Sequence, residues 1–224
     1  MIRRPLGRAA VALTLAATVL TGCADDGDPD PGAESSGPTE TGSATPYLPV
    51  PDGVELTPQG TRLKVEDTAV VAYEPRQELV GVLELTVTKL EETTTRRTMA
   101  SWQLTPQQEA STPYFVHVTA KNVGETDLSR RPVPLYAVNE DDLLLEATPF
   151  ASSFEPCPST PFPKGFTPGA EADLCLVYLA PDHGSLEAVS FRPEETFDPI
   201  YWTGDVVKYV PPKPEKPKKP KKKR

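Results

Sequence analysis

Several short stretches of the chain alternate apolar and polar side chains with a period of two. Within residues 114–123, Val116, Val118 and Ala120 alternate with the polar residues His117, Thr119 and Lys121. Successive side chains of a strand point to opposite faces of a sheet, so this pattern predicts a strand with one buried face. Residues 80–90 alternate in the same way. Similar patterns predict strands at residues 63–73, 133–139, 143–147 and 186–192.

Two further segments complete the predicted domain. Residues 174–179 are apolar without alternation, which predicts a central strand covered on both faces. The 27 prolines are too frequent for long helices, but Thr105 and Pro106 suit the N-cap and first position of a short one. We therefore predict an all-β domain over residues 47–210, a sandwich or barrel with at most one short helix.

The N-terminus carries a different apolar pattern. Arg3, Arg4 and Arg8 precede an uncharged apolar run over residues 9–20, which is typical of an export signal and too short to span a bilayer. The run ends in Leu20-Thr21-Gly22-Cys23, which resembles the lipobox of bacterial lipoproteins. The resemblance implies cleavage after residue 22, a diacylglyceryl group on Cys23 and anchoring on the extracytoplasmic face of the cell membrane. The alternative is an ordinary secretory signal with a chance cysteine.

The cysteine count agrees with an exported protein. If Cys23 is lipidated, Cys157 and Cys175 remain, and a disulfide is their default state in an oxidising compartment. Closing a loop of this length stabilises a fold by roughly 3 kcal/mol. A two-thiol metal or redox site is the alternative, but it needs further ligands or a C-x-x-C spacing.

Charge divides the chain into segments. Residues 23–210 hold 12 basic and 31 acidic side chains, a net charge of −19, which argues against nucleic acid as a partner. Residues 23–46 contain no large apolar side chain, so we expect a disordered linker after the signal peptide at residues 1–22. Residues 211–224 carry +7 and should form a disordered tail. Its basic residues are Lys213, Lys216, Lys218, Lys219, Lys221, Lys222, Lys223 and Arg224.

Two motifs of the domain resemble a known family. The stretch Tyr114-Phe-Val-His-Val-Thr-Ala-Lys-Asn-Val-Gly124 is similar to a strand of the telokin-like, immunoglobulin-like domains found in many secreted bacterial lipoproteins. Phe166-Thr-Pro-Gly-Ala170, followed by Cys175-Leu-Val-Tyr-Leu-Ala-Pro181, is similar to a later turn and strand of that family. The resemblance implies an immunoglobulin-like β-sandwich without catalytic residues. The proline-rich residues 157–166 depart from the family pattern.

The inventory of reactive side chains is small. The two histidines, His117 and His183, lack close ligand spacing, and we expect His183 in a type I turn, so we predict no metal site and no cofactor. Adjacent strand residues point to opposite faces, so acid pairs such as Glu91-Glu92 cannot share a substrate. Trp102, Tyr201 and Trp202 could stack on a sugar, but aromatic residues of β domains more often pack in the core.

These observations leave three hypotheses for function. The first is a membrane-anchored, non-enzymatic interaction module that binds an envelope protein or an anionic wall polymer. The second is an enzyme or accessory subunit that acts on wall or lipid polymers through carboxylates brought together only in the fold. The third is that the basic tail binds an anionic polymer or membrane surface while the domain serves as a spacer.

Overall fold

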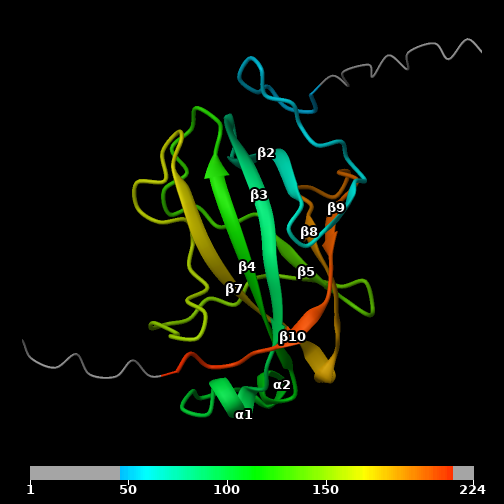
Figure 1. Cartoon of the computed structure of the whole chain (residues 1–224), viewed down its shortest axis with the longest axis vertical. Helices are drawn as coiled ribbons and strands as arrows, with labels where there is room; N and C mark the ends of the chain where they lie inside the picture. Colours follow the sequence, from blue (N-terminus) through cyan, green and yellow to red (C-terminus); the bar gives the residue numbers. More distant parts are fainter. Residues whose placement is uncertain (1–45, 214–224) are drawn as a thin grey trace, which may run out of the picture. The chain divides into compact units, whose positions relative to one another are not determined.

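The computed structural model describes residues 46–213, which form two facing five-stranded sheets (Figure 1). The first sheet has the order β1 (Arg62–Lys64), β9 (Ile200–Thr203), β8 (Leu186–Phe191), β5 (Tyr136–Asn139) and β6 (Leu144–Leu145). The second has the order β10 (Val206–Lys208), β3 (Leu79–Glu92), β4 (Thr112–Asn122) and β7 (Glu171–Ala180), and β2 (Thr68–Arg76) also pairs with β3. The predicted all-β sandwich is confirmed.

The core between the sheets follows the period-two pattern. Along β3, Leu83, Leu85 and Val87 are fully buried, and Val116 and Val118 of β4 belong to the same core. Phe191, Ile200 and Trp202 contribute from the facing sheet. The alternation of β3 and β4 therefore identified the inner face of this sheet correctly.

A second apolar cluster covers the outer face of the β3–β4–β7 sheet. It is built from Met99, Phe115, Phe154, Cys157, Val177 and Tyr209. This cluster explains why β7 lacks alternation: Leu176 and Tyr178 face the main core, whereas Val177 and Leu179 face the outer cluster. The strand is covered on both faces as predicted, but it lies at the edge of its sheet, so its expected central position is wrong.

Short elements account for the other differences from the sequence prediction. Residues 63–73 form two strands in different sheets, because the chain turns at Glu66, whose φ is 81°. The helix at Thr105 is present as α2 (Pro106–Glu109), and its capping box joins Thr105 to Gln108. A second single turn, α1 (Thr95–Thr98), lies in the same loop, so the expectation of at most one short helix is wrong. Strands β9 and β10 were not anticipated, since each has only three or four residues.

The chain enters and leaves the sandwich at opposite ends of β3. Near its start, Tyr47 Oη accepts a hydrogen bond from the Ala72 amide, and Ala72 pairs with Val82. Near its end, the Tyr209 amide donates to the carbonyl of Glu92, 2.9 Å away. A strand rises about 3.3 Å per residue, so these two points are roughly 30 Å apart. Figure 1 shows the first and last described segments at opposite ends of the view.

One buried hydrogen bond across the sandwich provides a test of this fold. The hydroxyl of Tyr178 on β7 donates to the carbonyl of Leu135, 2.9 Å away, and Tyr178 is fully buried. We expect Tyr178→Phe to lower the free energy of unfolding by about 1–2 kcal/mol, because the carbonyl loses its partner away from water. Urea denaturation should show this loss. Tyr201→Phe, at a partly exposed position on β9, is the control and should change stability by less than half as much.

Candidate functional site

A compact polar cluster lies on the outer face of the β3–β4–β7 sheet. The carboxylate of Glu91 is 2.6 Å from Lys89 Nζ and 2.8 Å from His117 Nε2. The Glu91 side chain is only 6% exposed, whereas that of His117 is 33% exposed. Both carboxylate oxygens of Glu91 are therefore engaged, each by a different cationic or donor group.

A β-bulge in β3 positions this cluster. Val87 pairs with Val118, but the next pair is Lys89 with His117, so Thr88 is an extra residue. The extra residue keeps Leu90 in the core and places Lys89 and Glu91 together on the outer face. The alternation of residues 80–90 breaks at this point, but the sequence alone did not identify the bulge.

The electrostatics of Glu91 follow from its partners. Burial alone would raise the pKa of this carboxyl, but the hydrogen bonds from Lys89 and His117 outweigh burial and hold its pKa below the ordinary value. The charged carboxylate is therefore the stable form in the folded protein. An acid held in this form is suited to positioning its neighbours.

The predicted disulfide adjoins the cluster. Cys157 and Cys175 are bonded, which confirms the pairing inferred from the cysteine count. Cys175 Sγ lies 3.9 Å from His117 Nε2, and Cys157 is fully buried in the outer apolar cluster. The bond thereby fastens the proline-rich loop before residue 160 to the sheet.

Other predicted site residues fall in two groups. Cys23 and its lipobox, the linker and seven basic tail residues lie outside the described residues; the seven are Lys216, Lys218, Lys219, Lys221, Lys222, Lys223 and Arg224. Lys213 is described and is exposed. Within residues 46–213, no three or more His, Cys, Asp and Glu side chains are arranged to hold a metal ion.

The acid pair Glu91-Glu92 and the second histidine occupy separate environments. Glu92 pairs with Lys208 of β10, so the two adjacent acids contact different groups, as strand geometry predicts. His183 is exposed in a turn, η1 (Pro181–His183), far along the chain from His117. The expected type I turn is wrong: Asp182 and His183 both have positive φ, which is the mirror-image turn, type I′.

The aromatic residues mainly serve packing. Trp202 is fully buried, and its Nε1 donates to the carbonyl of Asp67. Trp102 is partly buried and packs edge-on against Phe150, with ring centroids 4.9 Å apart. Tyr201 lies beneath the guanidinium of Arg62. Packing thus accounts for each of the three rings considered for sugar stacking.

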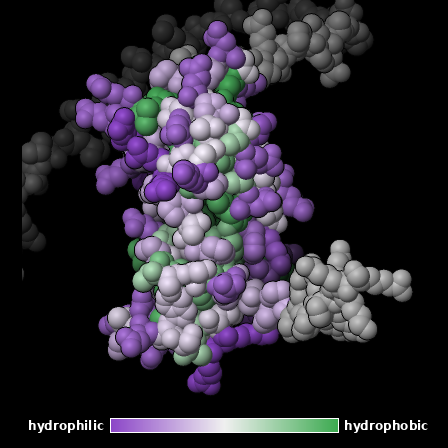
Figure 2. Space-filling view, turned by 90° about the vertical axis from the view of Figure 1, so that its left-hand side faces the viewer, coloured by the Kyte–Doolittle hydropathy of each residue, from purple (hydrophilic) through white to green (hydrophobic). Residues whose placement is uncertain are grey.

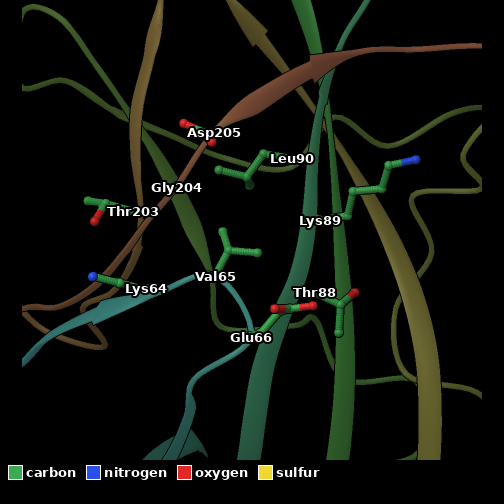
Figure 3. Close-up of a pocket in the computed structure, with 9 residues that line it drawn as sticks. All are labelled: Lys64, Val65, Glu66, Thr88, Lys89, Leu90, Thr203, Gly204 and Asp205. Atoms are coloured by element: carbon green, nitrogen blue, oxygen red, sulfur yellow. The ribbon is translucent and has the colours of Figure 1, made fainter.

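An open hollow lies where the edge of β3 changes partner. Strand β2 ends its pairing at Thr86, and β10 begins at Leu90, which leaves a space of about 570 Å³ between them. Figure 3 shows Val65 and Leu90 in the middle of this hollow, while the Lys89 side chain points away from it. Its polar residues are spread around a wide rim and do not converge on a common point.

A more apolar groove of about 460 Å³ opens beside β7. Pro132, Val133 and Leu135 line it from the segment before β5, and Leu176 lines it from β7. Sequence reasoning missed this groove. A usable signal was present, because residues 132–163 contain seven prolines and no lysine or arginine.

Comparisons with known proteins give no assignment: no family model, curated protein or solved structure matches the chain. None of the helices in the described part of the chain is long and apolar enough to span a membrane. We therefore infer function from the arrangement of residues alone.

The Glu91 cluster predicts a pH-dependent contribution to stability. The folded pKa of Glu91 lies below its ordinary value of 4.5, so its contribution is complete above that value and is lost as the pH falls through the folded pKa. We expect Glu91→Gln to lower the free energy of unfolding at pH 7 by about 1–2 kcal/mol, since it breaks two charge-assisted contacts.

Denaturant titrations between pH 7 and pH 3 should show that the parent and Glu91→Gln differ less and less in free energy of unfolding as the pH falls below 4.5. Glu84→Gln is the matched control, because Glu84 is more exposed and lies 3.5 Å from Lys121. Its effect should be within about 0.5 kcal/mol. A loss of unfolding free energy in Glu91→Gln that is the same at every pH would contradict this account of the cluster.

The disulfide should stabilise the domain measurably. Replacing both Cys157 and Cys175 by serine removes a cross-link spanning 18 residues, and we expect a loss of about 3 kcal/mol in the free energy of unfolding. Adding a thiol reductant to the parent protein should reproduce most of this loss and leave the double variant unchanged. Equal stability of the parent and the variant under oxidising conditions would disprove the expected role.

Proposed function

We propose that this chain is a lipoprotein of the extracytoplasmic face of a bacterial cell membrane, with a β-sandwich that acts as a non-enzymatic binding module. The observation that carries the proposal is the separation of the two chain ends along β3. Tyr47 fixes the entry beside the start of the strand, and Tyr209 fixes the exit beside its end. A tether at one end and a basic segment at the other suit a domain that links a membrane to a second component.

The leader supplies the membrane attachment in this proposal. Leu20-Thr21-Gly22-Cys23 follows a basic and then an apolar stretch, the order found in export signals. Residues 24–45 then separate Cys23 from the described domain. At 3.3–3.6 Å per residue, these 22 residues could reach at most about 75 Å. The sandwich could therefore work well clear of the headgroups.

An immunoglobulin-like ancestry forms part of the proposal. The sandwich of that fold places strands A, B, E and D in one sheet and strands C, F and G in the other. Taking β3, β4 and β7 as A, B and E, and β5, β8 and β9 as C, F and G, follows that arrangement, with β6 as an added C′ strand and no counterpart of D among the described residues. The motif around Asn122 fits as well, because the Asn122 side chain caps the turn by accepting from the Gly124 amide.

The polar cluster has a structural role in this proposal. Both oxygens of Glu91 are engaged by Lys89 and His117, and the disulfide borders the same histidine. A carboxylate held this way organises the sheet surface, whereas a general base needs a free oxygen within reach of a substrate proton. We therefore assign the cluster to the structure of the outer face.

Two measurements test the proposed function. The parent chain should fractionate with membranes. Mass spectrometry should show that its N-terminal peptide begins at Cys23 and that this cysteine carries a diacylglyceryl group. The Cys23→Ala variant should lose both properties while the domain remains folded, because the lipid is the only membrane attachment proposed. An unmodified cysteine in membrane-bound parent protein would overturn the anchor.

The binding role needs a separate readout. Photo-crosslinkers placed singly at exposed positions near the groove, such as Thr160, and on the opposite end, such as Glu55, should be compared in cells. We expect a discrete adduct from one region in the parent chain and its loss or reduction in Cys23→Ala, which removes the chain from the envelope surface. No adduct from any surface position would count against a binding module.

A further inference from the structure

The groove beside β7 has no ligand assigned to it by the proposed function. It is lined largely by apolar atoms from Pro132, Val133, Leu135, Pro149, Pro161 and Leu176. Figure 2 views the molecule from the side on which β7 lies, and a band of apolar and near-neutral residues runs between polar margins there. Hydrophobic grooves of this kind bind peptides in several recognition domains.

The segment that builds the groove carries a net negative charge, although Arg130, Arg131 and Lys164 lie at its two ends. All but one of the lining residues come from residues 132–163, which contain five acids and no lysine or arginine. Glu146 is exposed on the groove wall. Tyr136 continues from the groove into a neighbouring hollow, which holds Glu194 and Glu195 together with Arg192. The border of the groove is therefore suited to a basic ligand.

The neighbouring edge of β7 is already paired, which restricts how a ligand could bind. The Thr148 amide donates to the carbonyl of Val177, and the Ser159 amide donates to the carbonyl of Cys175. The Ser159 hydroxyl also accepts from the Val177 amide. An added strand would have to displace these bonds. A polyproline II peptide needs no strand pairing, because it is recognised through its side chains in grooves lined by aromatic residues, and Tyr136 lines this one.

The chain itself contains a basic segment with that periodicity. Prolines recur every third residue at 214, 217 and 220, and lysines recur every third residue at 213, 216, 219 and 222. A polyproline II helix has three residues per turn, so it would align the prolines on one side and these lysines on another. The side with the prolines would then fit the apolar groove, and the side with the lysines would face the acidic residues at its border.

The exit of the chain lies close enough for this segment to reach the groove. Tyr209 packs against Phe115 in one cluster with Phe154 and Cys157. Those two residues belong to the loop between Pro149 and Pro161, and both prolines line the groove. The exit and the groove therefore lie on two sides of one loop. Residues 214–224 span about 34 Å at 3.1 Å per residue.

We propose that the groove beside β7 binds the chain's own C-terminal segment, residues 213–222, with its prolines in the channel and its lysines toward Glu146 and the neighbouring acids. Because this contact does not involve the lipid, it can be tested in the mature chain carrying Cys23→Ala. Its failure would leave the membrane anchor untouched.

The test compares amide NMR spectra of this full-length mature chain with those of a tail variant in which Pro214, Pro217 and Pro220 are alanine. The charge of the tail is unchanged. We expect shifts concentrated at groove residues such as Val133, Tyr136 and Glu146. The control replaces three of the four prolines of the linker, Pro29, Pro31 and Pro38, with alanine and should leave the groove signals in place.

A synthetic peptide of residues 211–224 should then restore the groove signals of the tail variant. The same peptide with its three tail prolines at 214, 217 and 220 replaced by alanine should bind at least tenfold more weakly. On the groove side, Thr160→Arg adds bulk and positive charge at an exposed lining position and should abolish the restoration, whereas Thr167→Arg, at an exposed position outside the lining, should not.

Three results would overturn the proposal. The first is groove signals that do not change in the tail variant. The second is equal affinity of the two peptides, which would mean that charge alone attracts the tail. The third is groove shifts that grow with protein concentration, which would assign the groove to the tail of a second copy.

Discussion

The structure depends on one constraint: the β3–β4–β7 sheet has apolar side chains to bury on both of its faces. The facing sheet covers the inner side, but the outer side, with Phe115 and Val177, needs a cover drawn from loops. Loops rarely bury apolar surface unless they are held in place, because ordering them costs conformational entropy. The bond between Cys157 and Cys175 holds this loop, and Tyr209 closes the cluster from the C-terminal side.

The other features follow from covering that outer face. The bulge at Thr88 turns Lys89 and Glu91 outward at the margin of the cluster, where the buried carboxylate is satisfied by Lys89 and His117. The loop that the disulfide holds also forms one wall of the apolar groove, because Pro149 and Pro161 at the two ends of the loop line the groove. The same packing fixes where the basic segment leaves the domain. The outer apolar cluster, the polar cluster at its margin and the groove wall thus all belong to one covered surface.

The two proposals describe different parts of the molecule and are compatible. A lipid at Cys23 would fix the chain to a membrane, whereas docking of the C-terminal segment concerns the groove beside β7. If the groove beside β7 holds the basic segment, an anionic wall polymer or membrane surface would compete with the groove for the same lysines. Such competition would unite the interaction-module and basic-tail hypotheses, because the tail would be available only where anionic charge is abundant.

The sequence by itself determined the all-β class, most strands, the cap at Thr105 and the partnership of Cys157 with Cys175. Each of these rests on local periodicity, on a neighbouring residue or on counting, so no long-range information was needed. Only the tertiary structure decided that β7 lies at an edge, that residues 63–73 divide between two sheets, and that Glu91 meets His117. Strand order and register arise from pairing between residues far apart in the chain, and a single extra residue such as Thr88 exchanges the faces on which all later side chains lie.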